Sequence, residues 1–552
     1  MSRWPWMLLA LLPLALSGCT QQSSTPNPGP SDPDDVETGP WDGSAQTLPE
    51  RTDAIGQTAY SDCHYKLPPN TQVTACDDPS LFFDRSSCPS DAFNSLDSTG
   101  TYQIVTRTVS GLTYASFGLR IPSDGTPSTL FDGGRDVAFL GGIPQKEGTP
   151  LTQQQVGAGS FSFSMTFPWN PPRDFARSYL FAGCTRPEPD RINGCFALCS
   201  NGGIRSVGTF TAVRTHWGRG EAESGGGLTL VSETAAPLPQ SGEVTVAKNH
   251  AYVVGLPTNN YSGGLAVFDV SDRAHPVLVK SLPFGNATPT YAVAARGDAL
   301  YVGGFGRYGG GFLVYDISNP ADPQPVGVQS SVGSLFVDGD RLYTTGGQGA
   351  DVQVYDISTP LAPVLLQRVT PLVEGTTGPL GVSAWQGRLY VNHGVGGFLA
   401  FDVSNPTSFR QLGGYNFVNQ YSNASVVGTF AGRTIAFEAG QGLNAHLRVL
   451  DVTDPNQMRL IGEHTLRSEF SINHLVLKGT RLYTTWFQEG VRVLDVSIPT
   501  QPHEVAFFNT YRETDTGRKG RTLEGASGIH VPGDGYVYVA DTHRGLLIFN
   551  EP

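Results

Sequence analysis

Histidine and acidic residues recur in the second half of the chain, where they could act as general bases, metal ligands or binding groups. The candidates are His393, His446, His474, His530 and His543, with Glu438, Glu489 and Asp541. Hydrolytic or lyase chemistry requires several such side chains to converge in one pocket. The chain has no Gly-x-Ser-x-Gly, no His-Glu-x-x-His, no phosphate loop and no calcium-type loop. We therefore assign no catalytic residue, no metal and no cofactor.

A phrase that recurs six times determines which elements carry these residues. Each copy is a short β-branched or aromatic run, then Asp, Val or Ile, and Ser or Thr, and five copies end in Pro. The period of 40–49 residues, with four short strands bounded by Gly, Asp or Pro, is typical of one propeller blade per copy. The six aspartates are Asp269, Asp316, Asp356, Asp402, Asp451 and Asp495.

The two ends of the repeat region predict how the ring closes. The C-terminal segment supplies only three strands, near 528–531, 536–539 and 546–550, and a lone strand stands at 227–232. Pairing that strand with the last blade removes an open sheet edge. We expect seven blades; six or eight would follow if one repeat were misread.

The phrase, with its Asp-Val/Ile-Ser-x-Pro tail, resembles the LVIVD-repeat proteins, a bacterial family predicted to form propellers. The resemblance covers about residues 240–550, although Arg273 replaces the proline in the first copy and Asn550 the aspartate in the last. It implies a propeller fold and an extracytoplasmic setting, and it supplies no catalytic residues. We expect the repeated Asp and Ser to stabilise turns at strand ends.

The turns between the second and third strands differ from blade to blade. In a propeller they share one face with the blade-to-blade connections, here called the top face, so we expect this face to bind the ligand. For each histidine, the alternative is that it caps a turn or fills a strand pair. Trp385, His474 and His530 are expected on innermost strands. The binding-face candidates are Tyr308, His393, His446, Trp486, Glu489, Asp541 and His543.

The N-terminal segment predicts export and lipid anchoring. Residues 1–18 read as a signal peptide, with one Arg before an apolar run too short to span a bilayer. Leu16-Ser17-Gly18-Cys19 resembles a bacterial lipobox, which implies lipid attachment at Cys19 and, since Thr20 follows, outer-membrane sorting. An ordinary signal peptide is the alternative. Residues 19–50, rich in Ser, Pro and acid, are expected to form a disordered tether.

The remaining cysteines predict a disulfide-containing β domain over residues 51–225. They are confined to this region, and an exported chain favours their oxidation over zinc binding. Sequence does not choose among the 15 pairings; Cys184 and Cys195 flank a turn that they could staple. Alternating strands indicate a small barrel or sandwich. The candidates are Cys63, Cys76, Cys88, Cys184, Cys195 and Cys199.

These features predict an all-β chain with a seven-bladed propeller at 226–552. A net charge of −13 disfavours nucleic acid and direct binding to anionic lipid. We expect a monomeric, lipid-anchored protein of the bacterial envelope whose propeller is a non-enzymatic binding or scaffold module for a protein or glycan. The alternative is a metal-assisted hydrolase or lyase that uses the top-face His, Asp and Glu residues.

Overall fold

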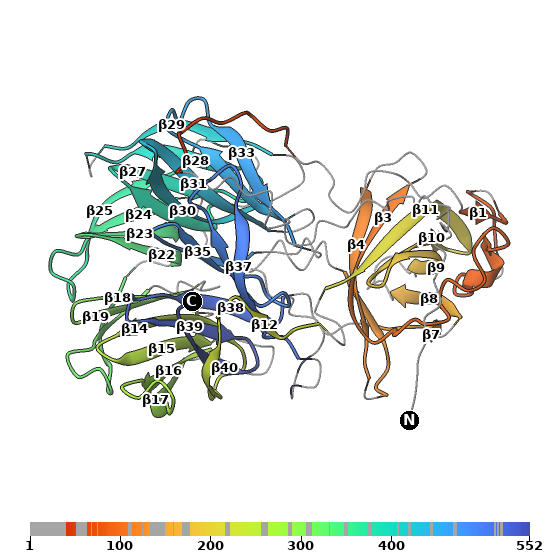
Figure 1. The fold of residues 1–552 in the computed structure, drawn as a ribbon, viewed down its shortest axis with the longest axis horizontal. Helices are drawn as coiled ribbons and strands as arrows, with labels where there is room; N and C mark the ends of the chain where they lie inside the picture. The colour runs from red at the N-terminus through yellow and green to blue at the C-terminus, as the bar shows by residue number, and fades with distance from the viewer. Residues whose placement is uncertain are drawn as a thin grey trace, which may run out of the picture.

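The computed structural model shows an all-β protein with an N-terminal domain and a ring of blades (Figure 1). It describes residues 40–552 except 51–62, 68, 74, 109–112, 124, 133–148, 158, 168–176, 216–220, 256–262, 285–289, 305–311, 330–331, 347–350, 372, 374–377, 406–407, 418–420, 442–444, 467–471, 513–514, 516–517 and 519–522. The proposed signal peptide, Cys19 and Tyr308 lie outside the described residues.

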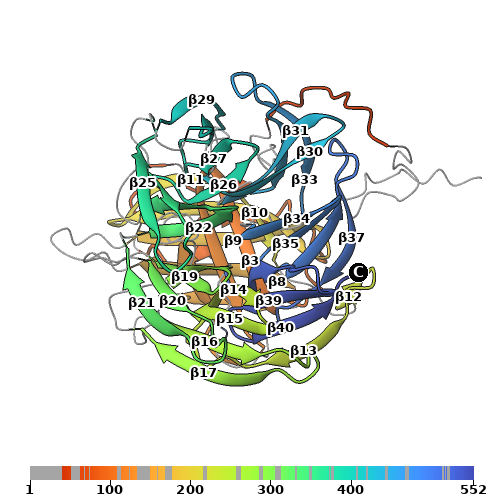
Figure 2. The same cartoon turned by 90° about the vertical axis from the view of Figure 1, so that its left-hand side faces the viewer.

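Seven antiparallel blades form the ring, as the repeat spacing predicts (Figure 2). Blade 1 consists of β14 (Ser241–Ala247), β15 (His250–Gly255), β16 (Gly264–Asp269) and β17 (Val277–Pro283), and blade 2 of β18 (Thr290–Arg296), β19 (Ala299–Gly304), β20 (Leu313–Asp316) and β21 (Gln324–Val328). Blade 3 consists of β22 (Val332–Asp338), β23 (Arg341–Gly346), β24 (Val352–Asp356) and β25 (Val364–Val369), and blade 4 of β26 (Gly381–Trp385), β27 (Arg388–Asn392), β28 (Phe398–Asp402) and β29 (Arg410–Tyr415). Blade 5 consists of β30 (Tyr421–Phe430), β31 (Arg433–Gln441), β32 (Leu447–Asp451) and β33 (Arg459–His464), and blade 6 of β34 (His474–Lys478), β35 (Arg481–Thr485), β36 (Val491–Asp495) and β37 (His503–Phe508). Blade 7 consists of β38 (Ala526–His530), β39 (Tyr536–Asp541), β40 (Gly545–Asn550) and β13 (Leu230–Thr234).

The ring closes as expected, because β13 pairs antiparallel with β40 as the outermost strand of blade 7. The first strand of each blade lies innermost, and each innermost strand contacts the next around the axis. Apolar side chains fill the spaces between neighbouring blades, for example between blades 6 and 7 and between blades 7 and 1. Closure therefore joins the start of the propeller to its end through both backbone pairing and shared cores.

The repeated phrase makes the strand-end turns that its residue types predict. In all six copies, Oδ1 of the aspartate accepts a hydrogen bond of 2.7–3.1 Å from the backbone N–H two residues later. The phrase also joins blades, because Tyr252 donates its hydroxyl proton to the carbonyl of Pro320 at 2.9 Å and Tyr301 does so to Pro360 at 2.8 Å. The repeat is thus a structural element of the ring.

The N-terminal domain is a strongly curved antiparallel sheet in the order β6-β5-β4-β3-β11-β10-β9-β8-β7, a half-barrel. Phenylalanines from several strands fill its concave side, including Phe117, Phe163, Phe181 and Phe210. Its elements are β1 (His64–Tyr65), a 3-10 turn η2 (Pro79–Leu81), β2 (Phe83–Asp84), β3 (Gly100–Thr108), β4 (Thr113–Ile121), β5 (Thr129–Asp132), β6 (Thr149–Pro150), β7 (Gln153–Gly157), β8 (Ser160–Phe167), β9 (Arg177–Glu188), β10 (Arg191–Ser200) and β11 (Gly203–Arg214).

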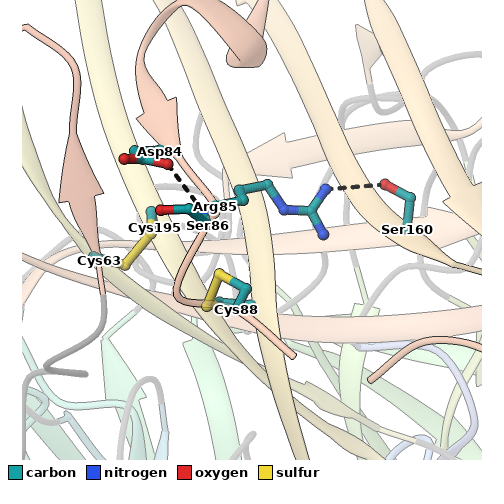
Figure 3. Close-up of a disulfide and its surroundings, with 8 residues drawn as sticks. Cys63, Asp84, Arg85, Ser86, Cys88, Ser160 and Cys195 are labelled. Atoms are coloured by element: carbon teal, nitrogen blue, oxygen red, sulfur yellow. Dashed lines mark hydrogen bonds between the residues drawn. A yellow bond between two sulfur atoms is a disulfide. The ribbon is translucent and has the colours of Figure 1, made fainter. Parts of the chain in front are cut away.

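Three disulfides attach the segment around β1, η2 and β2 to the centre of this sheet. They join Cys63 to Cys195, Cys76 to Cys199 and Cys88 to Cys184. Around the first of them, Ser86 donates its backbone N–H to Asp84 at 3.0 Å, and Arg85 reaches towards Ser160 of β8 (Figure 3). A second apolar cluster, which includes Phe82 and Phe83, fills the space beneath this segment.

The Cys184–Cys195 staple considered from the sequence is therefore wrong. In the β9–β10 pair, Cys195 lies opposite Ala182, not opposite Cys184, and the register shifts between Asn193 and Gly194. Both sulfur atoms bond instead to cysteines of the covering segment. Distant pairing of this kind depends on tertiary packing and is invisible in local spacing.

The tether expected over residues 19–50 is also wrong for residues 40–50, which lie along the outer side of blade 5 (the red-brown segment in Figures 1 and 2). The backbone N–H of Leu48 donates to the carbonyl of Leu460 in β33 at 2.8 Å. Trp41 and Leu48 pack against the cores that flank this blade. A few apolar anchors within a polar segment are enough to order it when a matching surface is available.

The chain makes a similar contact where it leaves the N-terminal domain. Strand β12 (Ser224–Gly225) pairs antiparallel with β37 and adds a fifth strand to blade 6. Figure 2 looks onto the ring with strands of the N-terminal domain behind its centre. Thr215, at the end of β11, donates a hydrogen bond to Gln488 in the second-to-third turn of blade 6, and both residues are buried. The N-terminal domain thus lies over the top face.

Candidate functional site

The predicted binding-face residues lie inside the top of the ring and contribute little surface. His393, His446, Trp486, Glu489 and Asp541 are all at most 3% exposed. The side chain of His543 is 9% exposed. They come from the second-to-third turns of blades 4, 5, 6 and 7, as expected. Binding of a ligand through them stays a prediction, but a partner cannot reach these side chains without moving the turns or the domain above them.

Two of the variable turns join neighbouring blades. Gly394 and Ser422 exchange backbone hydrogen bonds of 3.1 and 3.0 Å between blades 4 and 5, and Phe487 and Ala526 exchange bonds of 3.0 and 3.1 Å between blades 6 and 7. Each turn therefore bonds to the first strand of the next blade. The differences between these turns reflect different blade-to-blade contacts at least in part.

The acidic candidates are each paired with an arginine within or beside their own blade. Glu438 accepts from Arg448 at 3.0 Å, Asp541 from Arg518 at 3.1 Å, and Glu489 lies 3.5 Å from Arg492. Arg518 and the neighbouring backbone N–H groups hold the pKa of Asp541 below its usual value despite burial. Burial outweighs Arg448 at Glu438 and raises the pKa of that carboxyl.

These pairs do not build a metal site or a catalytic cluster. In the described part of the chain, no group of three or more His, Cys, Asp and Glu side chains is placed to hold a metal ion. His446 is 3.8 Å from Glu463, and His543 is 3.8 Å from Glu524, in different blades. Each of these side chains has its own partner within its own blade or beside it.

The described residues do form a cavity on the propeller axis. Its volume is about 190 Å³, and the upper parts of the innermost strands line it. Amide and hydroxyl side chains link the blades around this cavity: Asn423 donates to the carbonyl of Ile472, Asn473 to that of Ser527, and Ser527 to that of Ser241. The lining is half polar in character and suits a ligand that forms hydrogen bonds.

An ion pair crosses this cavity between blades 1 and 6. Nδ1 of His474 lies 2.5 Å from a carboxylate oxygen of Glu243, and both residues line the cavity. Blade 7 lies between the two, and its innermost strand has Gly528 there, where a Cβ would lie 2.5 Å from the Cα of Glu243. Burial disfavours the charged imidazole, but the Glu243 carboxylate outweighs it and raises the pKa of His474.

His530 lies beside this pair, and its pKa is shifted in the opposite direction from that of His474. Its Nδ1 accepts a hydrogen bond of 2.9 Å from the backbone N–H of Val246, which requires an unprotonated nitrogen. Burial, together with the positive charge of His474, lowers the pKa of His530 to about 4. His474, which lines the cavity, therefore favours the charged form, and the nearby His530 favours the neutral form.

We expect His530→Asn to reduce acid destabilisation of the ring. A neutral native His530 contributes stability above the unfolded pKa of about 6.5, and this contribution is lost as pH falls towards 4. Asparagine keeps an acceptor for Val246 without titrating. The difference in melting temperature between pH 7.5 and pH 4.5 should be smaller in the variant. An unchanged difference, with the variant folded at pH 7.5, would contradict this assignment.

A buried polar network leads outward from the channel to the N-terminal segment. Ser425, which lines the cavity, donates to Asn392 at 2.9 Å, and Asn392 donates to Ser422 at 2.9 Å. Ser422 donates to Glu438 at 2.8 Å. Arg448 links Glu438 to the other side, where its Nε donates to Glu50 at 2.8 Å. Tyr415 donates to the same Glu50 carboxylate at 2.7 Å.

Sequence reasoning had singled out His474 and Glu438 but missed their partners. Glu243 and Glu50 stand outside the variable turns, and Glu50 falls in a segment whose composition predicts a tether. Arg448 sits in the repeated phrase and looks like a strand residue. The signal in the sequence is that Arg448 interrupts a run of apolar residues. The structure shows that this position is completely buried, where a charge needs a partner.

Comparison with known proteins agrees with this architecture. The LVIVD repeat family model matches residues 240–282, 289–328 and 525–549, which are blades 1 and 2 and the C-terminal strands of blade 7. A search of the curated proteins found no match to the chain. No helix within the described residues is long and apolar enough to cross a membrane.

Solved structures similar to the chain come from different sources. They include the computationally designed Ika8 protein, with 13% identity and a TM-score of 0.38 over 59% of this chain and all of that one. Raptor of Chaetomium thermophilum has 11% identity and a TM-score of 0.44, over 58% of this chain and 29% of its own length. A protein from Lactobacillus plantarum has 16% identity and a TM-score of 0.41, over 53% of this chain and 89% of that one. Identities this low carry no functional information.

The fold and the matched segments together define the class of protein. It is a seven-bladed β-propeller with an N-terminal half-barrel domain that carries three disulfides. The ring contains LVIVD repeats, so the resemblance noted in the sequence is confirmed for these segments.

Proposed function

We propose that this protein is a non-enzymatic binding or scaffold module of the bacterial cell envelope, with a protein partner favoured over a glycan. One observation carries the proposal: the described top-face acids and histidines that could perform chemistry are held apart in separate blades, and the acids face arginines. Propellers commonly use such rigid rings to present binding surfaces. The ring is accordingly a support for recognition.

The cellular setting is part of the proposal. Three disulfides in a domain of this size support folding in an oxidising compartment. The lipobox-like sequence supports lipid attachment at Cys19, which would hold a chain with a net charge of −13 at a membrane surface. Cys19→Ala should abolish incorporation of radiolabelled palmitate and release the protein from the membrane fraction. Retention of both would contradict the anchor.

The functional proposal is tested on the purified intact protein with two measurements. Elemental analysis should find no stoichiometric metal, and affinity capture on envelope extracts and glycan arrays should yield a saturable partner. His393→Ala, His446→Ala and His543→Ala should leave that binding within a factor of about three in folded protein, because these residues are buried in turns. A stoichiometric metal, together with hydrolase or lyase activity that these substitutions abolish, would overturn the proposal in favour of the metal-assisted enzyme.

A further inference from the structure

Exposed apolar side chains recur on the outermost strands of three successive blades. Val277 of β17 is 58% exposed, Val328 of β21 is 64% exposed and Val364 of β25 is 60% exposed. Other exposed apolar residues lie beside them on the same strands: Leu278, Val279, Val326 and Leu365. Isolated apolar residues are ordinary on protein surfaces, but recurrence on the same strand of blades 1, 2 and 3 defines a surface, here called the apolar rim.

The equivalent strands of blades 5 and 6 are covered by this chain itself. On blade 6, β12 pairs with β37 through Ser224 opposite Phe508 and Gly225 opposite Phe507. On blade 5, the segment at 40–50 bonds to β33 through Leu48 and Leu460. The covered strands are correspondingly buried, with Leu460 at 1% and Phe508 at 4% exposure. Extended segments are therefore the natural cover for an outer strand in this ring.

The uncovered edges have the same construction as the covered ones. In blades 1 to 6, the pairing of the third and fourth strands shifts register at the corresponding position, two residues before the aspartate of the phrase. The outer strands thus present their backbone groups in the same pattern. Strand β21 is different, since Pro325 lacks an N–H, so blade 2 offers side-chain contact and less backbone pairing.

Charge near the apolar rim is already neutralised. Lys280 of β17 lies 2.7 Å from Asp322, and Arg368 of β25 lies 3.2 Å from Asp351. Recognition there must rest on apolar contact and backbone hydrogen bonds. Figure 2 shows β17, β21 and β25 along one side of the ring, away from the segment that covers blade 5, so a partner can approach them without displacing it.

We propose that the apolar rim binds an extended segment of a partner protein, which adds as a fifth strand to β25 or β17 and places alternate apolar side chains against the rim. This rests on the proposed binding function and names its surface and its partner chemistry. Strand addition obtains affinity from main-chain hydrogen bonds and specificity from alternate side chains. An uncovered strand edge with apolar side chains is the surface that such a segment recognises.

The test uses a phage-displayed library of random 12-residue peptides selected on the intact protein. We expect enriched peptides to alternate apolar and polar residues without proline, and to slow hydrogen exchange in β25 or β17. Val277→Lys with Val364→Lys should weaken their binding at least tenfold, because charge on a strand edge opposes pairing. Gln457→Lys, which adds one lysine at an exposed position of blade 5, should leave binding unchanged, whereas Val277→Lys or Val364→Lys alone should weaken it at the strand that binds the peptide.

The outcomes separate this inference from the proposed function. Peptides that bind the double lysine variant as tightly as the wild type, or that protect strands elsewhere, would overturn the rim and leave the binding function standing. Absence of any enriched peptide, while affinity capture still yields a partner, would overturn strand addition in the same way. Failure of both selection and capture would remove the binding function with it. Because the substituted valines are exposed, the variants should keep the wild-type melting temperature.

Discussion

Reduction of the intact protein is expected to unfold the N-terminal domain and leave the propeller folded. The disulfides span 132, 123 and 96 residues, and a cross-link over about 100 residues stabilises by roughly 4–5 kcal/mol in the chain-entropy model. The three loops overlap, so their joint effect is smaller than the sum. It still matches the whole stability of an ordinary domain, about 5–15 kcal/mol. Calorimetry with and without a phosphine reductant measures the shift.

The propeller supplies the internal control for that experiment. All cysteines after Cys19 lie between Cys63 and Cys199, so the ring has none to reduce. Its transition should stay within about 2 °C. A Cys63→Ser, Cys195→Ser variant should lose part of the stability without reductant. An N-terminal transition that reductant leaves in place would show that the aromatic core alone sustains the domain.

Arg448→Met is expected to destabilise the propeller by about 3–5 kcal/mol, since removal of one partner leaves buried carboxylates without a counter-charge. The Arg448 side chain is fully buried, and it bonds to both Glu438 and Glu50. It also lies over the ring of Phe417 at 4.1 Å. Urea unfolding followed by tryptophan fluorescence measures the change, and release of residues 40–50 should raise their susceptibility to protease.

Two variants show whether burial is the cause. Arg433→Met removes a half-exposed arginine of the same blade from its bond to Asp451 and should cost no more than about 1 kcal/mol. Arg448→Met combined with Glu438→Met should recover part of the loss, because the buried carboxylate is gone as well. Equal effects for Arg433→Met and Arg448→Met would show that the buried network carries no special stability.

The architecture of the ring was predictable because its signals are local or periodic. The hydrogen bond from the Ser backbone N–H to the Asp carboxylate spans two residues, and the blade period spans fewer than fifty, so both are visible in one sequence. The closing strand was also predictable, because three terminal strands without a fourth require a partner. Disulfide pairing was not, since it depends on how a distant segment folds over β9 and β10.

The candidate site was less predictable for a different reason. The sequence predicts variable turns for His393, Glu438 and Asp541, but Glu438 lies within β31 and Asp541 ends β39. Burial of the turns themselves depends on contacts with neighbouring blades and with the N-terminal domain. Composition predicted a tether around Leu48 and Glu50, although a few anchors bind that segment to blade 5. The exposure of Val364 could not be inferred either, because equivalent strands in blades 5 and 6 are covered.

Covered and uncovered blades together suggest how the molecule is organised. The two connections of the N-terminal domain dock on adjacent blades, 5 and 6, and the domain lies over the top face. Among the described residues, no further strand pairs with the outer strands of blades 1, 2 and 3, and several of their apolar side chains are exposed. In the proposed binding module, the half-barrel and the bound segments would leave the rim more accessible to a partner than the top face.

The central claim is that the ring is a binding module with its contact surface on the rim. Site-specific photocrosslinking in the producing cell is the most direct test of this claim. A photoreactive residue at position 364 or at position 277 should give a discrete adduct, with the crosslink mapped to an extended segment of the partner, and the residue at position 457 should give none. No adduct from either rim position, while the same residue placed in a top-face turn such as 395 captures a partner, would contradict the account.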